Sequence, residues 1–349
     1  MGHLICYYGV IKPKEITFMA VKTRIKLTNL ISKLPEEAVD SLYEIICPMF
    51  AEYSVPEKPC CPHCGGNSVV RNGHKCGKQE YLCKSCGKTF VSTTNTLMSG
   101  SHQPREIWEE VINDTLSGDA IDFTAKRLGM THDCVFRMRH KILGSLARLD
   151  ENQGFTLSDV SELDETFVLD CYKGKELPNA ITRRPRKHGA KAQKRGISSE
   201  YVCICTGVQR KGQAVAQTLN RAKPSSPELQ EIFGGHIARG TLVLCDGLKS
   251  YQCLENIAVC TVKDVGSENG TTFYNLNTVN AFHSFIKKRY EFYRGVATKY
   301  LNRYNALFST AYKCTAGKIC QITASLLNVS SINRCFSDRD VKTAGLLLI

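Results

Sequence analysis

Two closely spaced cysteine pairs constrain the fold of this chain more than any other feature of its sequence. Cys61 and Cys64 form one Cys-x-x-Cys pair, Cys83 and Cys86 form a second, and the eighteen residues 65–82 separate them. A glycine follows each pair, and glycine permits the tight turn that brings two thiolates onto one ion. This spacing is typical of a tetrahedral zinc site filled by four protein thiolates. We therefore predict a zinc ribbon that holds a structural Zn²⁺ ion.

Other cysteines and one histidine are alternatives to these ligands. Cys60, His63 and Cys76 lie nearby, but their spacing fits a ribbon less well. The chain has 18 cysteines in all, and several lie in apolar runs, as Cys203 and Cys205 do. No secretory signal is recognisable at the start of the sequence. We therefore expect reduced thiols and small buried side chains at these positions rather than disulfides.

The charge balance indicates a polyanionic partner. Lys and Arg number 46 against 33 Asp and Glu, which gives a formal net charge of +13. A length of 349 residues suggests two or three domains. No apolar run approaches the roughly 18 residues that a membrane span needs. We expect a cytoplasmic protein that contacts nucleic acid and no membrane.

Residues 120–146 have the pattern of a helix-turn-helix. Gly129 is placed to end a first helix and Thr131 to cap a second. An apolar stripe on the second helix leaves basic side chains on its other faces, available to DNA, namely Arg137, Arg139, His140 and Lys141. The alternative is an amphipathic helical hairpin with a solvated basic face. A basic loop at 182–196 is a further candidate for phosphate contact, through Arg183, Arg184, Arg186 and Lys187; the alternative there is a solvated loop.

Strands and helices alternate from residue 158 to 295, which predicts an α/β domain. Expected strands are Val160–Leu169, Tyr201–Val208, Ala214–Leu219, Thr241–Cys245 and Ile257–Val262, and expected helices are Ser226–Phe233 and Thr278–Tyr293. Asp164 interrupts the first strand, and Asp246 follows the fourth, where α/β sheets bind ligands. On the last helix Asn280, His283 and Lys287 share one face because they are three and seven residues apart.

These segments together resemble a known family. The two cysteine pairs, Leu163–Thr166, Cys245–Gly247 and Leu276–Ser284 resemble DDE-type insertion-sequence transposases with an N-terminal zinc ribbon, of the IS-fifteen-ninety-five (ISXO-like) group. The likeness covers roughly residues 55–310, and the block at 276–284 is its most specific part.

The resemblance implies an RNase H-like catalytic core. It places the catalytic positions at Asp164, Asp246 and Asn280, with Lys287 seven residues after the last. Most enzymes of this kind have glutamate where this chain has asparagine, and an amide oxygen can still bind Mg²⁺ or Mn²⁺. Lys287 would contact a phosphate near the scissile bond. His283 is an alternative metal ligand, although Mg²⁺ prefers oxygen.

The resulting hypothesis is a modular DNA transposase. Its expected parts are a helical N-terminal segment (1–55), a zinc ribbon (56–100), a helix-turn-helix-like module (101–150), the catalytic core (155–310) and a C-terminal tail (311–349). It would bind the terminal inverted repeats, cleave the 3′ strand and join it to target DNA through two metal ions, as a dimer or larger assembly in a bacterial nucleoid. The alternative is an inactive transposase, or a regulator that binds DNA without catalysis.

Overall fold

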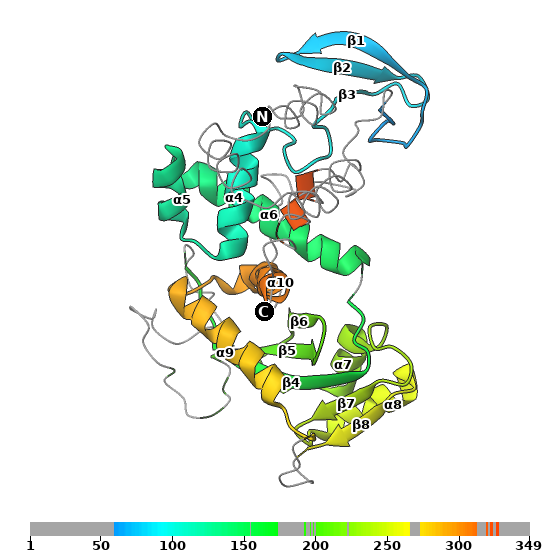
Figure 1. Ribbon diagram of the computed structural model, residues 1–349, viewed down its shortest axis with the longest axis vertical. Helices are drawn as coiled ribbons and strands as arrows, with labels where there is room; N and C mark the ends of the chain where they lie inside the picture. The colour runs from blue at the N-terminus through cyan, green and yellow to red at the C-terminus, as the bar shows by residue number, and fades with distance from the viewer. Residues whose placement is uncertain are drawn as a thin grey trace, which may run out of the picture. The chain divides into compact units, whose positions relative to one another are not determined.

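The structure is a computed structural model that describes residues 59–153, 155–173, 200–221, 223–265 and 273–312, with a few single positions and pairs outside these ranges. The predicted N-terminal helix, the basic residues Arg183, Arg184, Arg186 and Lys187, and most of the tail lie outside the described residues. The chain divides into two compact units (Figure 1). The first comprises residues 1–110 and 327–333, and the second comprises 111–326 and 334–349.

The first unit contains a small antiparallel sheet. Its strands β1 (Val69–Lys75), β2 (Lys78–Cys83) and β3 (Thr89–Val91) lie in chain order. Residues Cys76 and Gly77, both with positive φ, form the turn between β1 and β2, as two-residue hairpins require. Phe90 is buried and stacks on Tyr81. So few apolar side chains make a marginal core, which is why a ribbon needs a metal. Helix α4 (Arg105–Ser117) begins in this unit.

Helices α5 (Ile121–Leu128) and α6 (His132–Gln153) confirm the predicted turn between helices. Gly129 ends α5 in the left-handed conformation with φ 65°. The Thr131 hydroxyl accepts the Cys134 N–H at 3.3 Å and so caps α6. None of the described helices is long and apolar enough to cross a membrane.

The prediction that four basic side chains of α6 are available to DNA is wrong for three of them, because these three are buried. Arg139 and His140 are each 1% exposed and Lys141 is 9% exposed, because helix α10 (Leu301–Ala311) packs against this part of α6. The His140 ring lies 4.3 Å from the Tyr300 ring. Arg137 alone is exposed, and its guanidinium donates to the Asp133 carbonyl.

A mixed five-stranded sheet forms the centre of the second unit. Its order is β6 (Ala214–Thr218), β5 (Tyr201–Gln209), β4 (Val160–Leu169), β7 (Leu242–Cys245) and β8 (Thr261–Asp264). Strand β4 is antiparallel to β5 and parallel to β7. Only β5 runs opposite to the other four strands. This strand order and these directions are those of an RNase H-like core, as expected. The last strand begins four residues later than predicted, because α8 (Cys253–Ala258) occupies the preceding segment.

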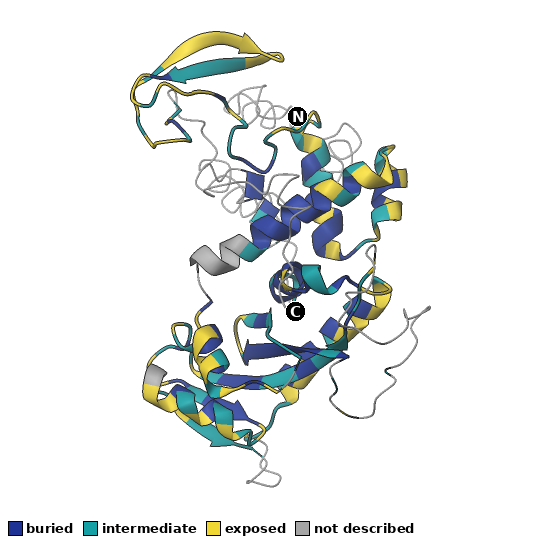
Figure 2. Cartoon of the chain, turned by 180° about the vertical axis from the view of Figure 1, so that it is seen from behind, coloured by how far each residue is buried: buried dark blue, intermediate teal, exposed yellow. Residues whose placement is uncertain are grey.

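The two faces of the sheet are covered by different helices (Figures 1 and 2). Helix α7 (Ser226–Phe233) and α8 contribute to a buried apolar cluster with Leu163 and Cys205. Helix α9 (Asn277–Phe292) contacts β4 and β5. Because side chains alternate along a strand, Glu162 and Asp164 face α9, whereas Leu163 and Glu165 face the α7 side. The register supports this, since Asp164 pairs with Thr206, which contacts α9.

Two candidate metal centres

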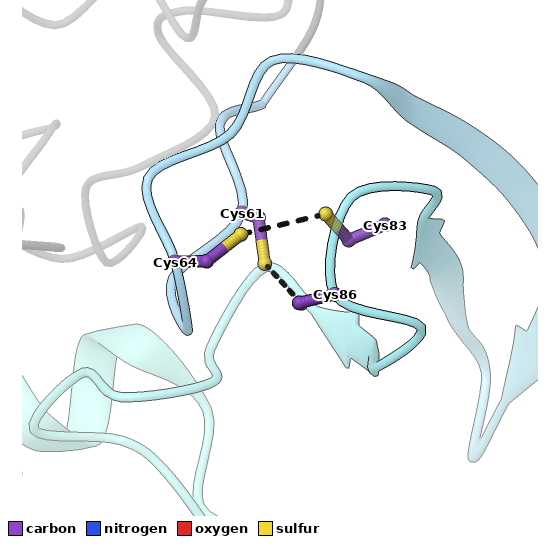
Figure 3. Close-up of side chains that lie close together, drawn as sticks. All are labelled: Cys61, Cys64, Cys83 and Cys86. Carbon is purple, nitrogen blue, oxygen red and sulfur yellow. Dashed lines mark hydrogen bonds between the residues drawn. The ribbon is translucent and has the colours of Figure 1, made fainter.

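The four predicted cysteines converge in the first unit (Figure 3). The Sγ atoms of Cys61 and Cys86 are 3.7 Å apart, and those of Cys64 and Cys83 are 3.6 Å apart. Four sulfurs at about 2.3 Å from one tetrahedral Zn²⁺ lie about 3.8 Å from each other. A disulfide would need about 2.05 Å. The cluster therefore fits a four-thiolate zinc site.

Matching backbone turns support the two cysteine pairs. The Gly65 N–H donates to the Cys61 carbonyl at 2.8 Å, and the Gly87 N–H donates to the Cys83 carbonyl at 2.9 Å. Both glycines have positive φ, 72° and 69°. The His63 backbone N–H lies 3.4 Å from the Cys61 Sγ, where it stabilises a thiolate. These turns direct the four sulfur atoms toward one another.

The alternative zinc ligands do not join this cluster. Cys60 is exposed, and its thiol donates to the Asn67 side chain. Cys76 is exposed in the turn between β1 and β2. His63 contributes its backbone N–H rather than its ring. Among the described residues, the cluster thus consists of the four cysteines of the two pairs.

A second cluster consists of carboxylates at the end of the central strands. One oxygen each of Asp164, Glu165 and Asp246 lies within 4.8 Å of the other two. The pairing of β4 with β7 stops at Glu162 and Leu244, whereas β4 runs on to Leu169. Beyond that point no strand among the described residues pairs with β4 on the β7 side, and the side chains of Asp164 and Glu165 lie close to that of Asp246. The structure thus brings together two of the three predicted catalytic positions.

Gly247 shapes the turn that carries Asp246. It has φ +83°, and a Cβ atom there would lie 2.5 Å from a carboxylate oxygen of Asp264. Both the conformation and the close approach require glycine. The Asp246 carboxylate accepts the Leu248 N–H at 3.3 Å and remains exposed. The predicted Asp-Gly pair therefore presents its carboxylate to solvent at the end of a buried strand.

Burial and mutual repulsion make the carboxylates of β4 easier to protonate. Burial raises the pKa of Asp164 from 3.8 to about 7; the charges of Glu165 and Asp246 add to this, while the Glu165 N–H and Lys287 oppose it. Burial and the Asp246 charge also raise the pKa of Glu165. Carboxylates that share a site in this way are stabilised when a cation binds among them.

Helix α9 is fixed to β4 by a carboxylate that the sequence did not single out. Glu162 is fully buried, and it accepts the Val279 N–H of the first turn of α9 at 2.9 Å. The Arg210 guanidinium donates to the same carboxylate at 2.7 Å and to the carbonyls of Phe273 and Asn275. A charged acceptor at a helix N-terminus satisfies a free N–H and the helix dipole.

The polar face of α9 is partly directed at the carboxylates. His283 is 6% exposed, and its Nδ1 lies 3.7 Å from an Asp164 carboxylate oxygen. Burial and the nearby Lys287 charge lower the pKa of His283 to about 4. Lys287 is exposed, and its charge acts on both Asp164 and His283. Asn280 is exposed in the first turn of α9, and its role as a ligand stays a prediction.

Glu165 and Glu162 are the site residues that the sequence reasoning missed. Glu165 follows Asp164 directly in the sequence, and the prediction assigned a catalytic role to Asp164 alone. The two side chains approach Asp246 past the last pair of β4 with β7, Glu162 with Leu244. For Glu162 the local sequence gives no signal, because β4 also contains Ser161, Asp164 and Glu165. Only the structure shows that Glu162 is buried, with Arg210 and the Val279 N–H as its partners.

Three comparisons relate the chain to known proteins. Residues 156–311 match the family described as "ISXO2-like transposase domain". A protein in the transposable element ISH50 of Halobacterium salinarum is 21% identical over 251 residues, which cover 71% of this chain and 83% of that protein. A structure of the Mos1 transposase paired-end complex with left transposon end aligns over 66% of this chain and 78% of that one, with 11% identity and a TM-score of 0.26.

Proposed function

We propose that this chain, whose residues 156–311 match the family described as "ISXO2-like transposase domain", cuts DNA at the ends of its own transposable element and joins them to a target. The observation that carries the proposal is the cluster of Asp164, Glu165 and Asp246 within 4.8 Å. The chain has a net charge of +13. Three carboxylates in such a protein would repel a phosphate backbone unless cations neutralised them.

Different residues would bind the metal ions and the DNA. Asp164 and Asp246 would hold Mg²⁺ or Mn²⁺, and Asn280 would add an amide oxygen from α9. A bound divalent ion lowers the pKa of water and stabilises charge on phosphate oxygens. Asp246 is exposed, so DNA can approach it. Lys287 is exposed on α9 and would pair with a phosphate next to the scissile bond.

Two phosphoryl transfers complete the reaction. In the first, water attacks the phosphorus at the 3′ end of the element, the bond from phosphorus to the 3′-oxygen breaks, and that oxygen leaves as a hydroxyl. In the second, this hydroxyl attacks a target phosphodiester, loses its proton, and displaces the 3′-oxygen of the target strand. Both steps are in-line displacements, so one site that positions the phosphate serves both.

Recognition of the element ends would fall to the other modules. The ribbon would hold Zn²⁺ through its four cysteines, and the N-terminal part of α6 would contact DNA through Arg137. The proposed partners are the terminal inverted repeats and the target duplex. Because two ends must be joined, we propose a dimer or larger assembly on DNA.

Asn280 favours a second candidate function. It supplies a neutral oxygen where most related enzymes have a carboxylate, and a neutral ligand binds Mg²⁺ more weakly. An inactive transposase or a regulator that only binds DNA would keep the ribbon, the helices and the positive charge.

A cleavage assay separates the two candidates. Purified protein is incubated with labelled duplexes that carry the ends of its element, in Mg²⁺ or Mn²⁺, together with Asp246→Ala and Glu231→Ala. Glu231 is the matched control because it is an exposed carboxylate on α7, outside the cluster. We expect cleavage and joining by the wild type and Glu231→Ala, and none by Asp246→Ala, with DNA binding by all three. If the wild type binds the DNA but cleaves it with neither Mg²⁺ nor Mn²⁺, the proposal that the protein is an enzyme is contradicted.

A further inference from the structure

His283 of α9 is a buried imidazole beside Asp164, one member of the carboxylate cluster; its ring is not among the three groups whose ligand atoms all lie within 4.8 Å of one another. Only 6% of its surface is exposed. Its Nε2 lies 2.6 Å from the Thr206 hydroxyl on β5, and its Nδ1 lies 3.7 Å from an Asp164 carboxylate oxygen. The two ring nitrogens therefore have different neighbours, and the hydrogen bond on one side determines the chemistry of the other.

The Thr206 hydroxyl fixes which nitrogen carries the proton. A hydroxyl has one hydrogen to donate, and Thr206 donates it to the Asp164 backbone carbonyl at 2.7 Å. Toward His283 the hydroxyl can then only accept, so Nε2 must carry the hydrogen. A neutral imidazole with its hydrogen on Nε2 has a lone pair on Nδ1.

When Asp164 is ionised, the Nδ1 lone pair and the carboxylate therefore face each other without a proton between them. A separation of 3.7 Å is too long for a hydrogen bond. Two electron-rich atoms in a buried place repel unless a cation lies between them. One divalent ion, with bonds of about 2.1 Å to nitrogen and oxygen, spans such a separation.

We propose that His283 Nδ1 is a ligand of the ion that Asp164 holds, which makes this a mixed nitrogen and oxygen site. The inference rests on the proposed function for the presence of an ion at Asp164, and it adds the identity of a ligand. Thr206 is the positioning residue, because its hydrogen bond orients the ring and sets its tautomer. Imidazole suits transition ions better than Mg²⁺, so the site prefers Mn²⁺ or Co²⁺ to Mg²⁺.

Two substitutions of His283 separate its two nitrogens. His283→Gln places an amide nitrogen near the position of Nε2 and keeps a donor for Thr206, but it removes the ligand at Nδ1. His283→Asn places an amide oxygen near the position of Nδ1 and loses the contact with Thr206. Thermal melts without divalent ions establish that each variant is folded, and Asp246→Ala identifies the Mn²⁺ that binds at this site.

The readout is Mn²⁺ binding to the full-length, zinc-loaded protein without DNA, measured by electron paramagnetic resonance. In the wild type we expect ¹⁴N modulation from a directly bound imidazole in the electron spin echo. We expect folded His283→Gln to lose this modulation and to bind Mn²⁺ at least about tenfold more weakly. His283→Asn should lose the modulation, retain binding better than His283→Gln, and shift the preference toward Mg²⁺.

The outcomes separate this inference from the proposed function. If Mn²⁺ binds in a manner that depends on Asp246 but shows no imidazole modulation, the His283 assignment is wrong and the proposed function stands. Unchanged Mn²⁺ binding and modulation in folded His283→Gln also overturns the assignment. If no Mn²⁺ binding depends on Asp246, both the assignment and the metal-dependent function fail.

Discussion

The Glu162 carboxylate on β4 accepts the backbone N–H of Val279 on α9 at 2.9 Å. This bond joins the strand that carries Asp164 to the helix that carries Asn280, His283 and Lys287. Arg210 completes the connection, because it binds Glu162 and also two carbonyls in the segment just before α9. The Glu162–Arg210 ion pair therefore helps to position the polar face of α9 relative to the carboxylates, together with the packing of α9 on β4 and β5.

Replacing Glu162 should destabilise the second unit strongly. Glu162→Ala leaves the Arg210 guanidinium and the Val279 N–H without their buried acceptor, and we expect a loss of about 3–5 kcal/mol in the free energy of unfolding. Urea denaturation measures it. The control is Glu109→Ala, which removes the Arg105–Glu109 pair, whose side chains are 28% and 32% exposed; there we expect less than about 1 kcal/mol. Equal losses would contradict the importance of the Glu162 bond.

The raised pKa of Asp164 predicts that its carboxylate destabilises the metal-free protein. Its pKa is about 7 when folded and 3.8 ordinarily, so between these values the folded state binds more protons and stability falls as pH rises. Asp164→Asn removes this loss. We expect the metal-free variant to be more stable than the wild type by about 2 kcal/mol at pH 8 and equal to it near pH 3.5, in denaturation at both pH values.

In the presence of divalent ions the wild type should become more stable than Asp164→Asn. Mn²⁺ binds the ionised wild-type site in the folded state only, so it raises wild-type stability by linkage and leaves Asp164→Asn nearly unchanged. The same protonation makes Mn²⁺ affinity fall as pH drops below about 7, by about tenfold for each unit at most. A stability difference between wild type and Asp164→Asn that did not change with pH would contradict the raised pKa.

The parts of the molecule that the sequence predicted best depend on local patterns. Gly129 predicted a turn because few other residues adopt the left-handed conformation that ends a helix. Thr131 predicted a cap because few side chains can accept a free N–H of the first helical turn. The cysteine spacing, also a local pattern, predicted the sulfur cluster. Asp246 was predictable because a buried strand ends next to it, and strand ends are where α/β sheets bind ligands.

Contacts between distant segments were beyond the sequence. The burial of Arg139 and Lys141 depends on α10, more than 150 residues further along the chain, and nothing within α6 indicates a partner there. The inclusion of Glu165 depends on the point where the pairing of β4 with β7 stops, at Glu162 and Leu244. The hydrogen bond of the His283 ring is made with Thr206, 77 residues away. These features arise from packing between distant segments, and the pattern of apolar residues within one helix or strand does not predict it.

Loss of zinc should unfold the ribbon and leave the RNase H-like core intact. The apolar core of the ribbon is small, so the metal supplies much of its stability. We expect Cys83→Ser to bind no zinc at this site, with loss of the thiolate-to-metal absorption that Co²⁺ gives when it replaces zinc. Cys76→Ser is the control, because Cys76 is exposed in the hairpin turn. Amide exchange should report lost protection in β1 to β3 and unchanged protection in β4, β5 and β7. Loss of protection throughout the chain would contradict this independence.

The different burial of Arg137 and Lys141 predicts different effects on DNA binding. Arg137 is exposed on α6, whereas Lys141, one turn further on, is 9% exposed. We expect Arg137→Ala to weaken binding at all duplex sequences and to reduce by about one the slope of log affinity against log salt, because one phosphate contact is lost. Lys141→Met should leave affinity and slope unchanged at temperatures where circular dichroism shows the variant folded. Fluorescence anisotropy over a range of salt concentrations measures both. A reduced slope in folded Lys141→Met, with none in Arg137→Ala, would reverse the assignment of the DNA-facing side of α6.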